Sequence, residues 1–344
     1  MNITGLHYDT RYNIHTMPDH VESATRLEHV IHRIENSGLL GHVQRIEGRT
    51  ATEQELLMVH TQAHLDRLQR ISAFGQPAII DHDTYMVPES YEIARMAVGG
   101  VFSLVDAVMN EKVRNAIAAI RPPGHHATPN QAMGFCLLSN VALAARYAQR
   151  QYGLERVAIV DFDVHHGNGT QDVFIKDDSV LFISTHQSPL YPGTGDVHEI
   201  GRGDGIGTTI NIPVRAGTGD QHFEILYQEI VIPALHRFRP ELIFISAGFD
   251  AHWLDPLASL RLSLTGYAYL GQLLHQAAED ICQGRIIASM EGGYNVDALS
   301  YGMLNLLRIF LGREEEIEDP LGQQKQRDYD IMQLVALLKS IHKL

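Results

Sequence analysis

The sequence predicts an α/β fold: a single domain in which helices flank a central parallel sheet. Short apolar runs rich in β-branched residues alternate along the chain with longer segments of helical periodicity. The apolar runs are too short and too uniform for surface strands, which indicates strands buried on both faces. Because helix-length segments separate these strands, we expect them to pair in parallel through helical crossovers.

Each apolar run defines one expected strand, and each helical segment defines one expected helix. The expected strands cover residues 115–120, 156–161, 180–184, 208–214, 242–246 and 285–290. The expected helices cover residues 89–109, 135–152, 221–237, 265–282, 296–311 and 324–342. This order of strands and helices is typical of an open sheet covered by helices on both faces.

The domain organisation is expected to be simple. The 344 residues contain no internal repeat, low-complexity tract or linker, so one domain is expected over 1–344. Its motif-bearing core is expected at about 5–311, followed by a C-terminal helical segment at 312–344. The acidic run REEEIED at 313–319 is interpreted as a solvated loop or a helix start.

Composition excludes several classes of protein. The chain has 27 Lys and Arg against 41 Asp and Glu residues, a formal charge of −14, which argues against nucleic acid or a membrane as partner. Its 2 cysteines cannot form a disulfide framework or a four-thiolate zinc site. The N-terminal residues do not resemble a signal peptide and no apolar run is long enough to span a membrane, so we expect a cytoplasmic protein. Whether it forms a homo-oligomer stays open.

Polar residues and glycines gather directly after five of the expected strands. The segments concerned are RPPGHH (121–126), DFDVHHGNG (161–169), TH (185–186), AGFD (247–250) and EGGY (291–294). In open α/β sheets ligands bind at the carboxyl ends of the strands, where such loops converge. The composition of strand-to-helix loops would explain one or two of these segments, but not all five. We therefore expect the functional site at this edge of the sheet.

Asp163 and His165 are the first candidates for metal ligands. On an extended segment, residues two apart point to the same side, so this carboxylate and this imidazole can bind one ion. Asp250, from another loop at the same edge, is the best candidate for the third ligand. Two carboxylates and one imidazole with open positions suit Zn²⁺, and Fe²⁺, Co²⁺ or Mn²⁺ would also be accepted.

A pair of histidines and a tyrosine supply the remaining chemistry. His125 and His126 follow a rigid Pro-Pro-Gly turn, and beside a metal such a pair is suited to general acid–base catalysis. Asp161 and Asn168 are available to orient the two rings. Because a carboxylate raises the basicity of an imidazole more than an amide does, the two histidines are expected to differ in proton affinity. Tyr294 follows two glycines that can aim its phenol into the cleft to stabilise an oxyanion.

These groups together indicate metal-assisted hydrolysis of an amide or ester. The ion and the phenol would polarise the carbonyl, one histidine would take a proton from the attacking water, and a histidine would protonate the leaving amine. Rival chemistries lack their signatures, since the chain has no HExxH, no P-loop, no GxSxG and no GxGxxG.

Several motifs, in order from about residue 5 to 311, resemble those of the histone deacetylase and acetylpolyamine amidohydrolase superfamily, especially its class II and bacterial deacetylase-like branch. They are RPPGHHA (121–127), GFC (134–136), DFDVHHGNGTQ (161–171), the segment 184–196 with YPGTGD, SAGFDAH (246–252) and EGGYN (291–295). The resemblance implies the arginase/deacetylase fold, with a parallel sheet of about eight strands.

The resemblance also implies roles for individual residues. It implies a catalytic Zn²⁺ ion on the three ligand candidates named above. His126 would be the main general base and acid, oriented by Asn168. His125 would assist electrostatically, oriented by Asp161, and Tyr294 would stabilise the oxyanion.

Further positions follow from the same resemblance. Phe135 and Tyr191 would wall a narrow tunnel for an acyl-lysine-like chain, and Gly134 would accept its amide proton. Arg26 would line an internal product channel. A structural K⁺ would bind oxygens of Asp161, Asp163, His165, Ser184 and Thr185. A second cation site would lie near Phe174, Asp177 and Val180.

Three positions depart from the usual family pattern. Val21 follows His20 where the family usually has proline, and Tyr191 replaces the usual phenylalanine of the tunnel wall. Leu257 stands where polyamine-selective members tend to have glutamate, which favours acyl-lysine. The expected function is zinc-dependent removal of acetyl or acyl groups from N-acyl-lysine in peptides or proteins. The alternatives are hydrolysis of an acetylpolyamine or another small N-acyl amide, and non-catalytic binding of acyl groups.

Overall fold

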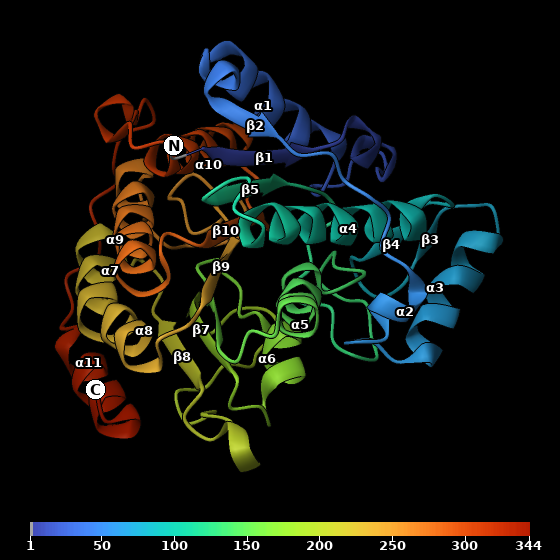
Figure 1. The fold of residues 1–344 in the computed structure, drawn as a ribbon. Helices are drawn as coiled ribbons and strands as arrows, with labels where there is room; N and C mark the ends of the chain where they lie inside the picture. The colour runs from blue at the N-terminus through green and yellow to red at the C-terminus, as the bar shows by residue number, and fades with distance from the viewer. Residues whose placement is uncertain (1–2) are drawn as a thin grey trace.

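An eight-stranded parallel sheet forms the centre of the protein in a computed structural model that describes residues 3–344 (Figure 1). The strand order is β2-β1-β5-β10-β9-β6-β7-β8, and every neighbouring pair is parallel. The strands are β1 (Thr4–Tyr8), β2 (Val43–Arg45), β5 (Asn115–Ala119), β6 (Val157–Asp161), β7 (Val180–Gln187), β8 (Thr209–Val214), β9 (Leu242–Ala247) and β10 (Ile286–Met290). The predicted class, a single α/β domain with a central parallel sheet, is confirmed.

Helices cover both faces of this sheet because the parallel strands can be joined only by crossovers. They are α1 (Ala24–Asn36), α2 (Glu53–Leu56), α3 (Gln62–Ala73), α4 (Ser90–Met109), α5 (Asn140–Tyr152), α6 (Asn168–Phe174), α7 (Asp220–Leu226), α8 (Ile232–Phe238), α9 (Leu264–Cys282), α10 (Val296–Phe310) and α11 (Met332–His342). Helix α4 packs against α5 on one side of the sheet, and α10 packs against α1 and α9 on the other (Figure 1). All residues of β5, β6, β7, β9 and β10 are buried, which explains why their sequences are mostly apolar.

The six predicted strands are all present with small differences at their ends, whereas β1 and β2 were not predicted from the hydrophobic pattern. β1 carries a glycine and a histidine, and β2 has no fully buried residue, so neither gives a continuous apolar run. A short antiparallel pair, β3 (Ala78–Ile79) and β4 (Tyr85–Met86), lies outside the main sheet. Among residues 3–344, no helix is long and apolar enough to cross a membrane.

Three predicted helices need correction. The helix expected at 135–152 begins only at Asn140, because Phe135 has a φ of 68°, which is incompatible with a right-handed helix. The helix expected at 221–237 is divided into α7 and α8 by a π-helical turn at Tyr227–Val231. The helix expected at 324–342 begins at Met332, since the preceding segment is bound to a loop through the hydrogen bond from Arg327 N to Gly217 O, 2.8 Å long.

The acidic run at 313–319 contains a short 3₁₀ turn, Glu314–Glu316, between α10 and the C-terminal segment. Two of its ion pairs connect Glu316 to Arg313 and Glu318 to Arg308, so the run is partly fixed against α10. The functional groups lie elsewhere, at the carboxyl ends of the central strands.

Candidate active site

The three candidate metal ligands meet at the carboxyl ends of β6 and β9. Asp163 and His165 lie in the loop after β6, and Asp250 lies in the loop after β9, the neighbouring strand. All three are buried, and one ligand atom of each lies within 4.8 Å of the others. His165 Nδ1 is 3.1 Å from Asp163 Oδ1 and 3.2 Å from Asp250 Oδ2. The predicted triad is thus one compact cluster with two carboxylates and one imidazole.

Main-chain N–H groups fix the two carboxylates. Gly292 N donates to Asp163 Oδ2 at 2.8 Å, and Val164 N donates to Asp250 Oδ1 at 2.8 Å. The other oxygen of Asp250, Oδ2, is buried and makes no hydrogen bond. A buried carboxylate oxygen without a donor is costly unless a cation or a proton satisfies it. This oxygen, together with the ligand types, fits a divalent ion such as Zn²⁺.

Two glycines make room for the carboxylates. A Cβ atom on Gly292 would lie 2.2 Å from Asp250 Oδ2 and 2.4 Å from Asp163 Oδ2. A Cβ atom on Gly248 would lie 2.0 Å from Asp163 Oδ2. Distances this short are not possible between non-bonded atoms, so any side chain at either position would displace a ligand. These two glycines are therefore part of the cradle of the candidate metal site.

The pKa values of the three candidate ligands are shifted in different directions. Burial and the nearby Asp163 carboxylate raise the pKa of Asp250 to about 7. Burial lowers the pKa of His165, but the adjacent carboxylates of Asp163 and Asp250 outweigh burial and raise that pKa to about 10. Burial raises the pKa of Asp163, yet His125 and His165 together hold it well below the ordinary value. A divalent cation would replace the protons that these groups otherwise retain.

The two adjacent histidines have different partners. His125 Nδ1 donates to Asp161 Oδ2 at 3.0 Å, and His126 Nδ1 donates to Asn168 Oδ1 at 2.7 Å. Burial lowers the pKa of His125, but the charges of Asp163 and Asp161 outweigh it and raise that pKa to about 10. Burial and the neighbouring His125 hold the pKa of His126 well below its usual value. With Nδ1 donating to Asn168, a neutral His126 has its Nε2 free to accept a proton.

A cavity of about 180 Å³ opens beside the cluster. Its lining residues are Asp83, His126, Gly134, Phe135, His165, Leu190, Tyr191, Leu257 and Tyr294. All four residues predicted for the substrate tunnel therefore line this one cavity. His126 of the histidine pair and His165 of the candidate metal triad line it as well. The cavity is smaller than sites for drug-sized ligands, which suits a single extended chain.

The cavity wall has aromatic sides. The Tyr191 ring meets His126 edge-on, with 5.1 Å between ring centroids, and the Phe135 ring meets Tyr294 edge-on at 5.6 Å. Phe135 has a φ of 68°, a left-handed conformation that is rare for a bulky residue and often marks a functional position. The hydrogen bond from Phe135 N to Thr84 Oγ1, 3.0 Å long, helps to hold this conformation.

Tyr294 is placed by its own turn and by Arg26. Tyr294 N donates to Asp255 Oδ2 at 2.7 Å, and the guanidinium of Arg26 lies 5.0 Å from the centre of its ring. Burial raises the pKa of Tyr294 well above the ordinary value, so the phenol keeps its proton and can donate it in a hydrogen bond. The predicted product-channel residue Arg26 is itself buried behind this ring.

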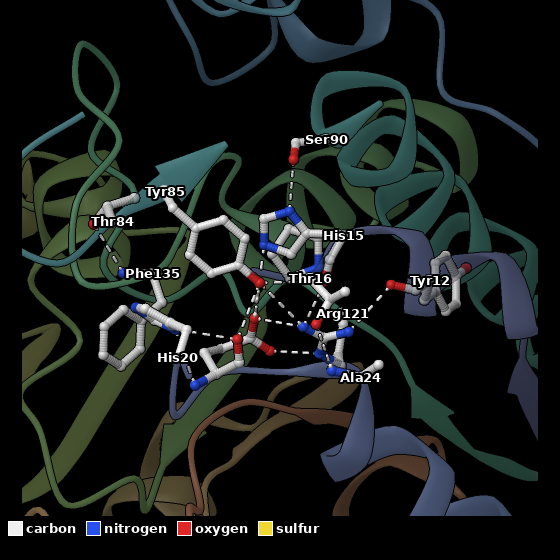
Figure 2. Close-up of polar contacts among 12 residues, drawn as sticks. Tyr12, His15, Thr16, His20, Ala24, Thr84, Tyr85, Ser90, Arg121 and Phe135 are labelled. Atoms are coloured by element: carbon white, nitrogen blue, oxygen red, sulfur yellow. Dashed lines mark hydrogen bonds and ion pairs between the residues drawn. The ribbon is translucent and has the colours of Figure 1, made fainter. Parts of the chain in front are cut away.

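A buried ionic network lies behind the cavity (Figure 2). The carboxylate of Glu22 contacts the guanidinium groups of Arg26 and Arg121, and all three side chains are buried. Around them, Tyr85 OH donates to Glu22 O at 3.0 Å, and the His15 ring stacks on Tyr85 with centroids 4.5 Å apart. This network joins the N-terminal segment to β4 and to the turn before the histidine pair.

The residues predicted for the cation sites lie farther along the same strands. Asp161 and Ser184 are register partners on β6 and β7, and Thr185 follows on β7; all three are buried. At the second predicted cation site, Phe174 and Val180 are buried. The Asp177 carboxylate there accepts hydrogen bonds from Ser179 N and Oγ and forms an ion pair with Arg146.

Several residues of the site were not predicted from the sequence as functional. Glu291 Oε2 accepts hydrogen bonds from Gly124 N at 2.7 Å and His125 N at 3.2 Å, and burial raises the pKa of this carboxyl to about 7. Asp255 holds Tyr294, and Asp83 lines the cavity. Glu291 could have been noticed as an acid inside the EGGY motif. Glu22 and Asp83 gave no signal, since nothing in their local sequence separates them from surface acids.

A parallel α/β sheet whose strand ends carry a buried carboxylate–imidazole cluster and a buried histidine pair defines a protein suited to metal-assisted hydrolysis. Comparison with protein families matches residues 20–310 to the histone deacetylase domain. The chain therefore belongs to the histone deacetylase family of hydrolases.

Similar proteins support this assignment over nearly the whole chain. A probable deacetylase of Archaeoglobus fulgidus is 39% identical, covering 99% of this chain and 97% of that protein. The histone deacetylase-like amidohydrolase of Pseudomonas aeruginosa is 38% identical, covering 88% of this chain and 80% of that protein. The crystal structure of the HDA15 HD domain has a TM-score of 0.91 and 35% identity, covering 99% of this chain and 96% of that chain. Membership of this enzyme family disfavours the alternative of a non-catalytic binder.

Proposed function

We propose that the protein is a zinc-dependent deacetylase that removes acetyl or other acyl groups from N-acyl-lysine side chains of peptides or proteins. One observation carries the proposal: the Asp163–His165–Asp250 cluster lies beside a narrow cavity whose wall also holds His126 and Tyr294. A Zn²⁺ ion on this cluster would act as a Lewis acid toward the amide carbonyl and would acidify water. Fe²⁺ or Co²⁺ are the substitutes that the same ligands would accept.

The side chains of this chain supply the proton transfers. His126, neutral and with Nε2 free, takes a proton from the water that attacks the carbonyl carbon. The Tyr294 hydroxyl donates a hydrogen bond to the carbonyl oxygen as that oxygen becomes negative. The proton held by the histidine pair then passes to the amine nitrogen, the C–N bond breaks, and a carboxylic acid and a free amine result. His125, bonded to Asp161, stays cationic and favours the neutral form of His126.

The shape and polarity of the cavity support an acyl-lysine substrate. Phe135 and Tyr191 provide aromatic walls that pack against a methylene chain, and Leu257 adds apolar surface. Gly134 also lies in the wall, and the family resemblance implies that its carbonyl accepts the substrate amide proton; in the free protein this oxygen accepts a hydrogen bond from Cys136 Sγ at 3.3 Å. We further propose a structural K⁺ on oxygens of the β6 and β7 ends, where Asp161 and Ser184 are register partners.

Turnover of a fluorogenic acetyl-lysine peptide, with and without a chelator, tests this proposal. We expect activity that dipicolinate abolishes and that added Zn²⁺ restores. Absence of chelator-sensitive turnover of the peptide, combined with robust turnover of an acetylpolyamine, would refute the acyl-lysine assignment.

A second substrate class is favoured by one observation. Asp83 is one of the residues that line the cavity, and its carboxylate would attract the second ammonium group of an acetylpolyamine. The comparison of kcat/KM for N-acetylputrescine and for an acetyl-lysine peptide decides between the two. We expect the peptide to be the better substrate because Leu257 offers no charge to a polyamine.

A further inference from the structure

Glu22 connects two arginines that hold different parts of the candidate active site. Its Oε1 accepts hydrogen bonds from Arg121 Nε at 2.5 Å and from Arg26 Nη1 at 3.0 Å, and its Oε2 accepts one from Arg121 Nη2 at 2.7 Å. Glu22 is 0% exposed, so water does not compete for these contacts. One carboxylate thus binds two guanidinium groups away from solvent.

The other hydrogen bonds of Arg26 go to the turn that carries Tyr294. Arg26 Nε donates to Gly293 O at 2.7 Å, and Arg26 Nη2 donates to Glu291 O at 2.5 Å. The guanidinium carbon also lies 5.0 Å from the centre of the Tyr294 ring. The Arg26 side chain therefore helps to hold the turn and its phenol in place.

Arg121 connects the same carboxylate to the turn of the histidine pair. It precedes the Pro-Pro-Gly turn that leads to His125, and its Nη2 donates to His15 O at 2.7 Å. Arg121 is 0% exposed and cannot move aside without breaking these contacts. Glu22 therefore links the turn of the histidine pair to the turn of Tyr294 through two guanidinium groups.

The negative charge of Glu22 compensates the positive charges of two buried arginines, which a neutral residue at this position could not do. Among residues 3–344, Glu22 is the one carboxylate that either guanidinium contacts. His15 is 3.6 Å from Glu22, but burial lowers the pKa of His15 to about 3, so it is neutral and adds no charge. Without the Glu22 charge, two buried guanidinium groups would repel one another, and Arg26 would lose the partner that directs it toward the Tyr294 turn.

We propose that Glu22 is a positioning residue of the hydrolytic reaction: through Arg26 it holds the Tyr294 hydroxyl where the oxyanion forms. The inference rests on the proposed function, because it assigns Glu22 to a step of that reaction. Glu22 itself touches neither the cavity nor the candidate metal ligands.

The isosteric variant Glu22→Gln tests this role, and Glu28→Gln, an exposed carboxylate in α1, is the matched control. We expect E22Q to lower kcat by about tenfold to a hundredfold, the effect of a misplacement of about 1 Å, with KM for the acetyl-lysine peptide unchanged. E28Q is expected to keep both constants. In a Tyr294→Phe background E22Q should cause no further loss, because the group that it positions is already absent.

A merely structural role gives a different pattern. It would lower the amount of folded enzyme while leaving kcat per folded molecule unchanged, or it would cause the same loss with and without the Tyr294 hydroxyl. Either result overturns the inference. If E22Q does not fold, Glu22→Asp carries the same test, since it keeps the charge but is too short to bind both guanidinium groups. Wild-type kcat in E22D would then overturn the inference.

A measurement without turnover separates this inference from the proposed function. The ¹⁹F resonance of 3-fluorotyrosine incorporated at position 294 reports the surroundings of that ring directly. A shifted or broadened resonance in E22Q, but not in E28Q, supports the inference even if the wild-type protein hydrolyses no acetyl-lysine peptide. Identical spectra in the wild type and E22Q overturn it. Absence of wild-type turnover overturns the proposed function alone.

Discussion

Replacement of Gly292 by alanine is expected to weaken metal binding because the added side chain displaces the candidate ligands. The added Cβ atom would lie 2.2 Å from Asp250 Oδ2 and 2.4 Å from Asp163 Oδ2. A carbon and an oxygen in van der Waals contact need about 3.2 Å or more, so at least one carboxylate must retreat by about 1 Å. Gly292 does not have a positive φ, so the backbone itself accepts alanine and the effect is confined to the ligands.

The size of the effect follows from that displacement. A shift of about 1 Å at a reacting group costs about a hundredfold in rate, and we expect a loss of zinc affinity of about tenfold to a hundredfold as well. Competition of the purified protein with a zinc-binding dye measures the affinity, and the acetyl-lysine peptide assay measures kcat/KM. Gly41→Ala is the control, because its Cβ atom would meet nothing within 4 Å. If G292A bound zinc and turned over substrate as well as G41A, the assignment of Asp163 and Asp250 as ligands would be wrong.

Three further predictions follow from the site. Asp250→Ala is expected to lose zinc and activity together, whereas His126→Ala keeps zinc, measured by elemental analysis, and loses most turnover; loss of zinc in both would make His126 a ligand. Leu257→Glu is expected to raise the ratio of kcat/KM for N-acetylputrescine to that for an acetyl-lysine peptide about tenfold, because the carboxylate attracts the second ammonium; an unchanged ratio would place that group elsewhere. Burial raises the pKa of Glu22, but Arg121 and Arg26 outweigh burial and lower it to about 2 from 4.5. Its charge therefore contributes stability above pH 4.5, about 3 kcal/mol at most, which is lost as the pH falls toward 2. Thermal unfolding against pH should show this loss in the wild type and a flatter profile in Glu22→Gln.

The hydrophobic pattern predicted the central strands because both their faces are buried. Every residue of β5, β6 and β9 is buried, so each strand appears in the sequence as a run of at least four consecutive apolar residues. The same pattern could not reveal β2, which has no fully buried residue. It also placed a helix start at Phe135, where the left-handed backbone of the cavity wall excludes a helix. Local composition thus predicts which segments form the core. It does not predict backbone conformations that the site imposes, such as the one at Phe135.

Short spacings likewise predicted part of the candidate site. Asp163 and His165 are two residues apart, and the neighbouring loop ends at Asp250, so the cluster follows from strand geometry alone. The supporting groups come from distant segments: Glu22 is 99 residues from Arg121, and Gly292 is 129 residues from Asp163. Such pairings become visible only when the chain is folded, because no local sequence pattern connects residues that lie so far apart along the chain.

The order of the strands has a consequence for how the protein is made. β5 is flanked by β1, the first strand of the chain, and by β10, the last, so the sheet is contiguous only after β10 has been synthesised. Asp163 and His165 leave the ribosome long before Asp250, and Gly292, which fixes Asp163, emerges later still. A nascent chain therefore contains two of the three candidate ligands before the third has been synthesised. We therefore expect that metal binding needs the last third of the polypeptide, which supplies Asp250 and Gly292.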